Sequence, residues 1–164
     1  MAVANNKNVD GEAAEAARAE RHAAMAVLAQ AEADEIERGL RLAGDGVEFT
    51  EPRPAEIGLI MLRGRIGGDG APFNVGEATV TRAAVQLASG VVGFGYVLGR
   101  DRRKARAVAL CDALLQADGY RQSVEQHILA PLRLAQQQHR VFAQEQTAAT
   151  RVDFFTLVRG EDER

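Results

Sequence analysis

The sequence predicts an α+β fold: N-terminal helices, a central antiparallel sheet of three to four strands, C-terminal helices and an extended apolar tail. Helix-forming residues dominate both ends of the chain, alternating apolar residues and glycine-rich turns fill its middle, and the two kinds of segment do not alternate. Such segregation is typical of α+β rather than α/β proteins. The length of 164 residues fits one domain, which we place at 18–164 behind a disordered extension at 1–17.

Two helices are expected in the N-terminal region. Nearly every residue in Glu12–Ala43 is a good helix former. The apolar stripe along this region lapses over Gln30–Ala33. We therefore expect one helix at about 13–30 and a second at about 34–43.

The middle of the chain is expected to form strands. Val47–Glu51 predicts a short strand, and Pro52–Pro54 after it predicts a rigid connector. Alternating apolar residues then predict longer strands at Ile57–Ile66, Phe73–Leu87 and Val91–Leu98. Because glycine-rich turns join these strands, we expect antiparallel pairing.

The last of these strands has two different faces. Val92, Phe94, Tyr96 and Leu98 fall on one face, while Gly93 and Gly95 fall on the other. Glycine inside a strand often marks the close approach of another backbone. We therefore expect another element to pack closely against the glycine face.

The glycine cluster Gly64–Gly70 is compatible with a nucleotide-binding loop or with a hairpin turn. Phosphate-binding loops lead from a strand into a helix whose N-terminus faces the anion. This cluster leads instead into Pro72–Val75, which has the pattern of another strand, and no GxxxxGK[ST] motif is present. The sequence therefore favours a hairpin turn.

Helices are expected again after the strands. The first is Asp101–Ala117, with Asp101 as its N-cap and Gly119 as its stop signal. The second region, Ser123–Ala149, is rich in helix formers but contains Ala130–Pro131. We expect an interruption there, because proline disrupts a helix interior.

Composition and motifs exclude several classes of protein. The net charge of −3 and the pI near 5.7 disfavour a nucleic-acid-binding protein that works through bulk electrostatics. The longest strongly apolar run, Val91–Gly99, is too short to span a bilayer, and no signal pattern opens the chain. We therefore expect a cytoplasmic protein without nucleic-acid or membrane partners. The single cysteine, Cys111, excludes an internal disulfide, and without metal-ligand spacing or a catalytic triad we assign no catalytic, cofactor-binding or metal residue.

Arginines supply the candidate binding residues. Arg82 lies in an otherwise apolar strand, so we expect it to be buried and paired with a carboxylate or phosphate, with Asp112 as a candidate partner within the chain. Arg100–Arg106 carries five positive charges and one negative at a helix start, where cations oppose the helix dipole. A phosphate, acidic side chains of another chain or plain solvation would each relieve that charge. The candidate anion or partner contacts are Arg82, Arg100, Arg102 and Arg103.

The segment Arg151–Gly160 near the C-terminus is apolar on both faces of an extended chain. We expect it to be buried on two sides, either within its own domain or with a partner chain on one side. Phe154 and Phe155 are the candidate interface anchors, because buried aromatic residues tend to dominate interface energy.

Three segments of the chain share a family pattern. They are Gly76–Leu87, Gly99–Asp101 with Ala109–Gln116, and Arg151–Gly160. In this order they resemble the PhnG family of the carbon–phosphorus (C–P) lyase system, over about Arg21–Gly160. The family often has proline where this chain has Ala31–Ala33, and residues 1–17 look like an added tail.

The resemblance implies a subunit that does not act alone. The family's machinery uses methylphosphonate to displace adenine from ATP, giving alpha-D-ribose 1-methylphosphonate 5-triphosphate, and a radical subunit with an iron–sulfur cluster then breaks the C–P bond. PhnG-like chains act in the first step with H, I and L subunits, and the nucleoside chemistry is attributed to the I subunit. The implied partners are therefore H, I, J and L types in a hetero-oligomer, with ATP as a substrate of the complex and no cofactor bound by this chain alone.

Together these observations predict an accessory subunit of the C–P lyase core complex. The alternative is a free-standing phosphate- or nucleotide-binding module that uses Arg82 and Arg100–Arg106. A self-sufficient nucleosidase has the least support, because no catalytic constellation is visible.

Overall fold

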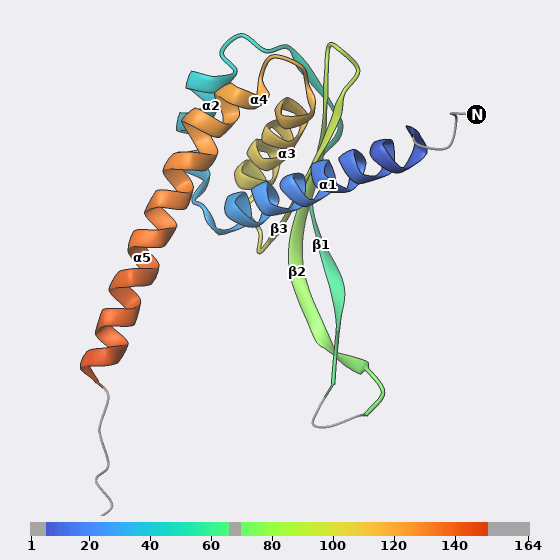
Figure 1. The fold of residues 1–164 in the computed structure, drawn as a ribbon. Coiled ribbons are helices and arrows are strands. Elements are labelled where there is room, and N and C mark those ends of the chain that lie inside the picture. The colour runs from blue at the N-terminus through green and yellow to red at the C-terminus, as the bar shows by residue number, and fades with distance from the viewer. Residues whose placement is uncertain (1–5, 66–69, 151–164) are drawn as a thin grey trace, which may run out of the picture. The chain divides into compact units, whose positions relative to one another are not determined.

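The computed structural model describes residues 6–65 and 70–150, which form helices before and after a three-stranded antiparallel sheet (Figure 1). The elements are α1 (Asn6–Gln30), α2 (Ala33–Ala43), β1 (Phe49–Gly64), β2 (Phe73–Leu87), β3 (Val92–Leu98), α3 (Arg102–Gln116), α4 (Arg121–Val124), a π-helical turn (Glu125–Leu129) and α5 (Ala130–Ala149). The α+β class is therefore confirmed. The chain divides into two compact units, Met1–Arg133 and Leu134–Arg164. A single domain at 18–164 stays a prediction.

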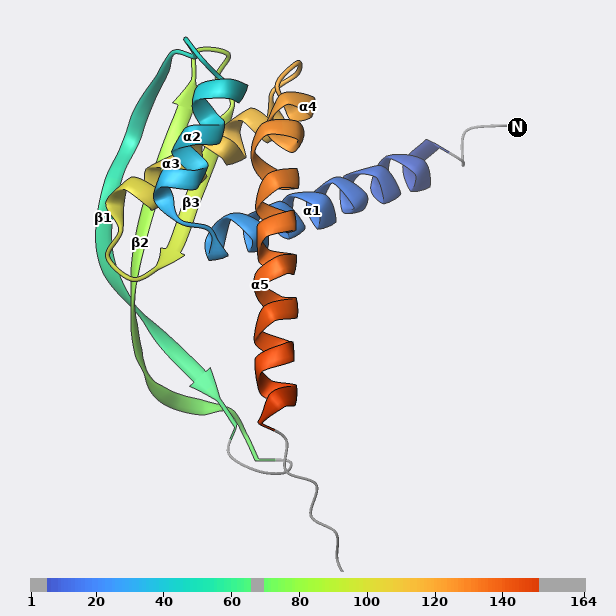
Figure 2. The same ribbon diagram turned by 90° about the vertical axis from the view of Figure 1, so that its left-hand side faces the viewer.

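The sheet has a covered inner face and an open outer face. Its strands follow the order β1–β2–β3, and each neighbouring pair is antiparallel. Helix α3 packs against all three strands and α2 packs on α3, so both lie on the inner side (Figures 1 and 2). The core fills the space between the inner face and the helices. Its fully buried residues include Leu28, Ile36, Val85, Leu114 and Ile128.

The two glycines of β3 allow α3 to lie close to the sheet. A Cβ atom at Gly95 would lie 1.9 Å from the carbonyl oxygen of Ala105, and one at Gly93 would lie 2.2 Å from that of Ala109. Both distances are far inside van der Waals contact, so a larger residue would displace the helix backbone. The prediction of close packing against the glycine face is confirmed, and the packing element is α3.

Strand β1 continues through Pro52 and Pro54, so the predicted connector at this point is wrong. Register shifts between Thr50 and Arg53, and between Arg53 and Glu56, accommodate the two prolines. In addition, β1 is an edge strand of the described sheet, and an edge position tolerates proline because one side of the strand needs no ladder hydrogen bonds.

Strands β1 and β2 form a long hairpin. Gly64 pairs with Phe73, which confirms that the glycine cluster joins two antiparallel strands; residues 66–69 lie outside the described residues. Strand β3 pairs with β2 only from Val80 onward. Among the described residues, the segment 73–79 of β2 therefore pairs with β1 alone.

Local capping explains where α2 and α3 begin. The Glu35 carboxylate accepts a hydrogen bond from the Glu32 backbone N–H at 3.1 Å, which starts α2 and places the break after α1 where it was predicted. Helix α1 itself begins at Asn6 and so includes residues expected to form the extension. The predicted N-cap of α3 is confirmed, because the Asp101 carboxylate accepts a hydrogen bond from the Lys104 N–H at 2.9 Å.

The C-terminal helical region continues where a break was predicted. A π-helical turn comes before Pro131, in which the Ala130 N–H donates to the Glu125 carbonyl oxygen. Pro131 follows directly, and the wider turn before it accommodates the proline ring, which in a regular α-helix clashes with the carbonyl group of residue i−4. The predicted interruption at Ala130–Pro131 is therefore wrong.

The second unit contains most of α5 and is described up to Thr150. Its helix exposes Leu134, Val141 and Phe142. The predicted apolar tail with Phe154 and Phe155 lies outside the described residues and stays a prediction.

Candidate functional site

Arg82 lies on the open outer face of the sheet, so its predicted burial is wrong. Its side chain is 48% exposed, and its Nε atom donates to the Glu56 carboxylate at 2.7 Å instead of pairing with Asp112. The reason is the alternation of side chains along a strand. Thr81 and Ala83, on either side of Arg82, are buried against the covered face, which directs Arg82 away from it.

Arg82 belongs to a surface that we call the outer-face patch. It consists of three rows, each made of residues paired side by side on β1, β2 and β3. The rows are Arg53–Ala84–Phe94, Glu56–Arg82–Tyr96 and Gly58–Val80–Leu98. Phe94, Tyr96 and Leu98 are 57%, 53% and 73% exposed, whereas Val80 and Ala84 are buried yet lie outside the main core cluster. The outer face therefore has an apolar layer of its own.

One charged cluster crosses the outer-face patch. A single Glu56 carboxylate oxygen lies 2.7 Å from Arg82 Nε and 3.7 Å from Arg53 Nε. Two guanidinium groups thus share one carboxylate, and the cluster keeps one net positive charge. About half of each of these side chains is exposed. Such ion pairs contribute little to stability in water, so their value to the fold alone is small.

The far half of the hairpin is a second exposed surface, the β1–β2 arm, which comprises residues 57–64 and 73–79. It extends past the N-terminal end of α3 and consists of two strands within the described residues (Figure 1). Its exposed apolar residues are Ile57, Leu59, Met61, Leu62, Phe73 and Val75. Because isolated two-stranded ribbons are marginally stable in water and apolar patches mark interaction sites, the arm is a candidate contact surface.

Part of the basic run at the start of α3 is neutralised within the chain. Arg103 Nη2 lies 2.6 Å from the Glu37 carboxylate and 2.8 Å from that of Asp34, both on α2. These hydrogen bonds raise the pKa of the Arg103 guanidinium. Lys104 Nζ donates to the Ala29 carbonyl oxygen at 2.8 Å. Acidic residues of this chain therefore supply part of the relief that was expected from a phosphate, from another chain or from solvent.

The four candidate arginines do not form one site. Arg103 pairs with a carboxylate of α2 on the inner side of the sheet, whereas Arg82 pairs with a carboxylate of β1 on the outer face. Arg106, in the same run, pairs with Glu51 at 2.7 Å. Arg100 and Arg102 are exposed and form no ion pair within the described part of the chain.

The buried carboxylate of Asp112 pairs with Arg21, which the sequence did not single out. Arg21 Nε and Nη2 each donate to one carboxylate oxygen at 2.6 Å, and the Phe94 backbone N–H donates to the same group at 2.8 Å. The Asp112 side chain is 1% exposed and that of Arg21 is 40% exposed. The hydrogen bonds to Asp112 raise the pKa of Arg21. This cluster ties α1 and α3 to β3 and holds the Phe94 backbone in place.

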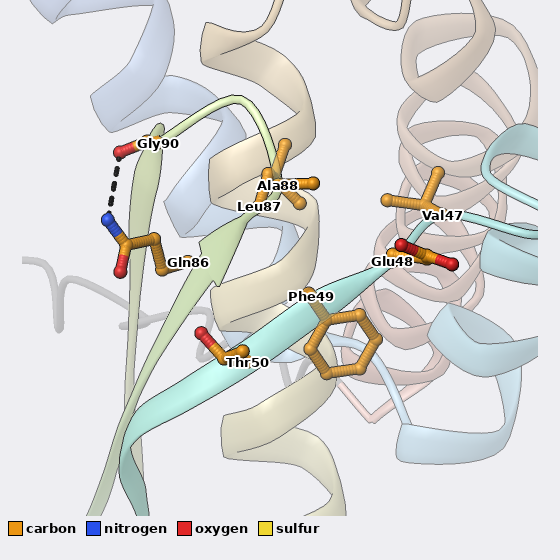
Figure 3. A pocket seen from close by; sticks show the side chains of 8 residues that line it. All are labelled: Val47, Glu48, Phe49, Thr50, Gln86, Leu87, Ala88 and Gly90. Carbon is orange, nitrogen blue, oxygen red and sulfur yellow. Dashed lines mark hydrogen bonds between the residues drawn. The ribbon is translucent and has the colours of Figure 1, made fainter.

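A shallow hollow of about 720 Å³ lies where β1 begins and where β2 turns into β3 (Figure 3). Its lining residues are Val47, Glu48, Phe49, Thr50, Gln86, Leu87, Ala88 and Gly90. Glu48 is the one ionisable residue of this set, and the labelled side chains do not converge on a point. The hollow therefore does not present a catalytic arrangement.

A larger groove lies between α1 and the segment that follows α3. Arginines line it, and three of them are already engaged by carboxylates of this chain. The pairs are Arg21–Asp112, Arg121–Glu20 and Arg133–Glu125. The carboxylates of Glu20, Asp118 and Glu125 also line the groove and repel a polyanion.

The described residues present neither a metal centre nor a reactive thiol. No three His, Cys, Asp or Glu side chains gather there in a way that could hold a metal ion. Burial, with a further contribution from the Asp112 charge, raises the pKa of the Cys111 thiol, so the thiol is protonated at neutral pH. Among these same residues, no helix has the length and apolar character needed to cross a bilayer.

The comparisons with known proteins agree on one family. Residues 19–160 match the family described as phosphonate metabolism protein PhnG. The chain is also 48% identical over 145 residues to the alpha-D-ribose 1-methylphosphonate 5-triphosphate synthase subunit PhnG of Rhizobium meliloti (strain 1021). That match covers 88% of this chain and 92% of the relative. The resemblance seen in the sequence is therefore confirmed, and the chain belongs to the PhnG family of phosphonate metabolism proteins.

Proposed function

We propose that this chain is the PhnG-type subunit of alpha-D-ribose 1-methylphosphonate 5-triphosphate synthase and serves it as an accessory component in organic phosphonate catabolism. The observation that carries this proposal is the match to the Rhizobium meliloti subunit over nearly the full length of both chains. The family match over residues 19–160 supports it.

The structure supports the proposal through the surfaces that it leaves open. The outer-face patch and the β1–β2 arm expose large apolar side chains on one small chain. Apolar surfaces of this kind are typical of sites that a partner covers. In a larger assembly, neighbouring subunits would cover both surfaces.

The proposal includes the partners and the chemistry of the whole complex. The partners are subunits of the H, I, J and L types, ATP and methylphosphonate are substrates of the complex, and this chain binds no cofactor by itself. The assembly is cytoplasmic. A free-standing phosphate- or nucleotide-binding module has less support, because Arg82 and Arg103 lie on different sides of the sheet and do not form one site.

Reconstitution tests the proposal. H-, I- and L-type subunits are co-expressed with and without this chain, with an affinity tag on the I-type subunit, and adenine release from ATP plus methylphosphonate is measured. We expect the full set to retain this chain on the resin and release adenine, and we expect the chain alone to release none. Adenine release by the isolated chain above a mock preparation, or full activity of a set that lacks it, would contradict the proposal.

A further inference from the structure

We propose that the outer-face patch docks an apolar surface of another synthase subunit, and that a carboxylate on that surface accepts hydrogen bonds from the donors of Arg53 and Arg82 that Glu56 leaves unused. The inference rests on the proposed function, because it takes the partner from the same assembly. The partner surface that it requires is apolar and carries one acidic residue.

The pairing of the strands gives the patch its layout. Its β3 column presents Phe94, Tyr96 and Leu98, all more than half exposed. In the register of the sheet, Arg82 lies opposite Glu56 of β1 on one side and opposite Tyr96 of β3 on the other, so the charged cluster lies beside Tyr96. A partner that covers the aromatic column therefore also covers the cluster.

Burial by a partner changes what the charged cluster requires. In the free chain, Glu56 serves two arginines, and solvent stabilises the remaining positive charge. Once the surface is covered, solvent no longer does so, and an uncompensated guanidinium is costly. A carboxylate from the partner restores neutrality and can accept hydrogen bonds from donors that Glu56 does not use.

The same cluster discriminates against a polyphosphate. Glu56 stands between the two arginines and repels a multiply charged anion, whereas one carboxylate balances the single net charge. A nucleotide base can stack on Phe94 or Tyr96, but one base is too small to cover the whole column from Phe94 to Leu98. Charge and apolarity together therefore favour a protein surface with one acidic residue.

The β3 backbone beneath the patch is held in place by contacts within the chain. Close contact of Gly93 and Gly95 with α3 fixes the β3 backbone, and Asp112 holds the Phe94 N–H at 2.8 Å. Anchors held in place lose little conformational entropy on association. A fixed backbone of this kind suits a docking surface. The stability of the fold alone does not require the large exposed side chains that β3 carries on the face opposite the glycines.

Pull-down of the co-expressed complex tests the inference with matched variants. The patch variants are Arg53→Gln with Arg82→Gln, and Leu98→Ser. Their controls are Arg121→Gln, which breaks the similarly exposed Arg121–Glu20 pair, and Leu42→Ser on α2, where the side chain is 66% exposed. Melting temperatures of the isolated chains show that each variant is folded.

We expect each patch variant to reduce the retained chain roughly tenfold or more, and each control to match the wild type. Glu56→Gln should also retain less chain, because two guanidinium groups then face the single carboxylate of the partner, while its melting temperature stays close to the wild-type value. Retention of Glu56→Gln equal to the wild type would overturn the inference, since it would show that the charge of the cluster plays no part in docking.

Two further outcomes are separable. If the wild-type chain assembles and all patch variants assemble equally well, the inference is wrong while the proposed function stands. If the wild-type chain does not assemble at all, both fail. Titration of the isolated chain with tripolyphosphate completes the test: binding that the arginine variants abolish, with pull-down unchanged, would assign the patch to phosphate and overturn the inference.

Discussion

The arginine–carboxylate pairs on the two sides of the sheet have the same chemistry and different roles. On the inner side, Asp112 is 1% exposed and receives Arg21 and the Phe94 N–H. On the outer face, Glu56 is half exposed and shared by two arginines. Burial decides the difference: a buried carboxylate needs its partner for the fold to be stable, whereas an exposed pair adds little. The inner side thus stabilises the fold, and the outer face keeps its charged and aromatic groups accessible.

The largest effect is expected where the inner face lies closest to its helix. Gly95→Ala should destabilise the chain by more than about 3 kcal/mol, because the added carbon meets the Ala105 carbonyl oxygen at 1.9 Å and α3 has to move. Gly58→Ala is the outer-face control, since nothing lies within 4 Å of its added carbon, and it should change stability by less than about 1 kcal/mol. Urea unfolding measures both. Equal stability of the two variants would contradict the close packing.

The next effect should come from the buried ion pair. Arg21→Met leaves the Asp112 charge buried without its cationic partner and should cost about 2–3 kcal/mol, less than for a fully buried pair because Arg21 is partly exposed. Asp112→Asn removes that charge. The double variant should therefore lose less free energy of unfolding than the sum of the losses of the two single variants. A double-mutant cycle by urea unfolding measures the coupling. Additive losses would show that the pair is not coupled.

High pH should lower the free energy of unfolding through Cys111, which is buried in the core on the inner side of the sheet. Its pKa in the folded chain is raised above the ordinary value of about 9, so the stability from its neutral form is complete below pH 9 and is lost as pH rises further. We expect a loss of about 1 kcal/mol between pH 9 and 10. The Cys111→Ala variant should lack this part of the pH dependence. Parallel unfolding free energies for the two proteins across this range would refute the expectation.

The smallest effect should be on the outer face. Arg82→Gln should change the free energy of unfolding of the isolated chain by no more than about 1 kcal/mol, because the Arg82–Glu56 pair is half exposed. The melting temperature of the variant checks this expectation. A loss like that of Arg21→Met would remove the distinction between the two faces.

Local patterns predicted most elements of the fold, because they depend on neighbours in the sequence. Alternation predicted β2 at Phe73–Leu87, glycine placement predicted the close packing on β3, and Asp101 predicted the start of α3. The wrong predictions depend on tertiary context. Proline is tolerated in β1 because that strand is at an edge, and at Pro131 because a π-helical turn comes before it.

The candidate site was predicted only in part. The sequence identified Arg82 and the aromatic face of β3, but the burial of Arg82 depends on which face of the sheet the helices cover. The ion-pair partner of Arg82 depends on the register of β1 and β2. If pairing continued without a shift from Gly64–Phe73, Ala55 would lie opposite Arg82. The register shift next to Leu62 places Glu56 there instead. Arg21, far from Asp112 in the sequence, carries no local signal that distinguishes it from other helix arginines.

The β1–β2 arm has a consequence for the chain before it assembles. Pro52 and Pro54 remove backbone donors from the near part of the β1 edge, but Glu56–Gly64 contains no proline and has apolar residues on both faces. Edges of this kind pair with further copies of themselves and seed aggregation. Chain made in excess over its partners is therefore exposed to aggregation and proteolysis, so its cellular level should follow the supply of whatever covers the arm.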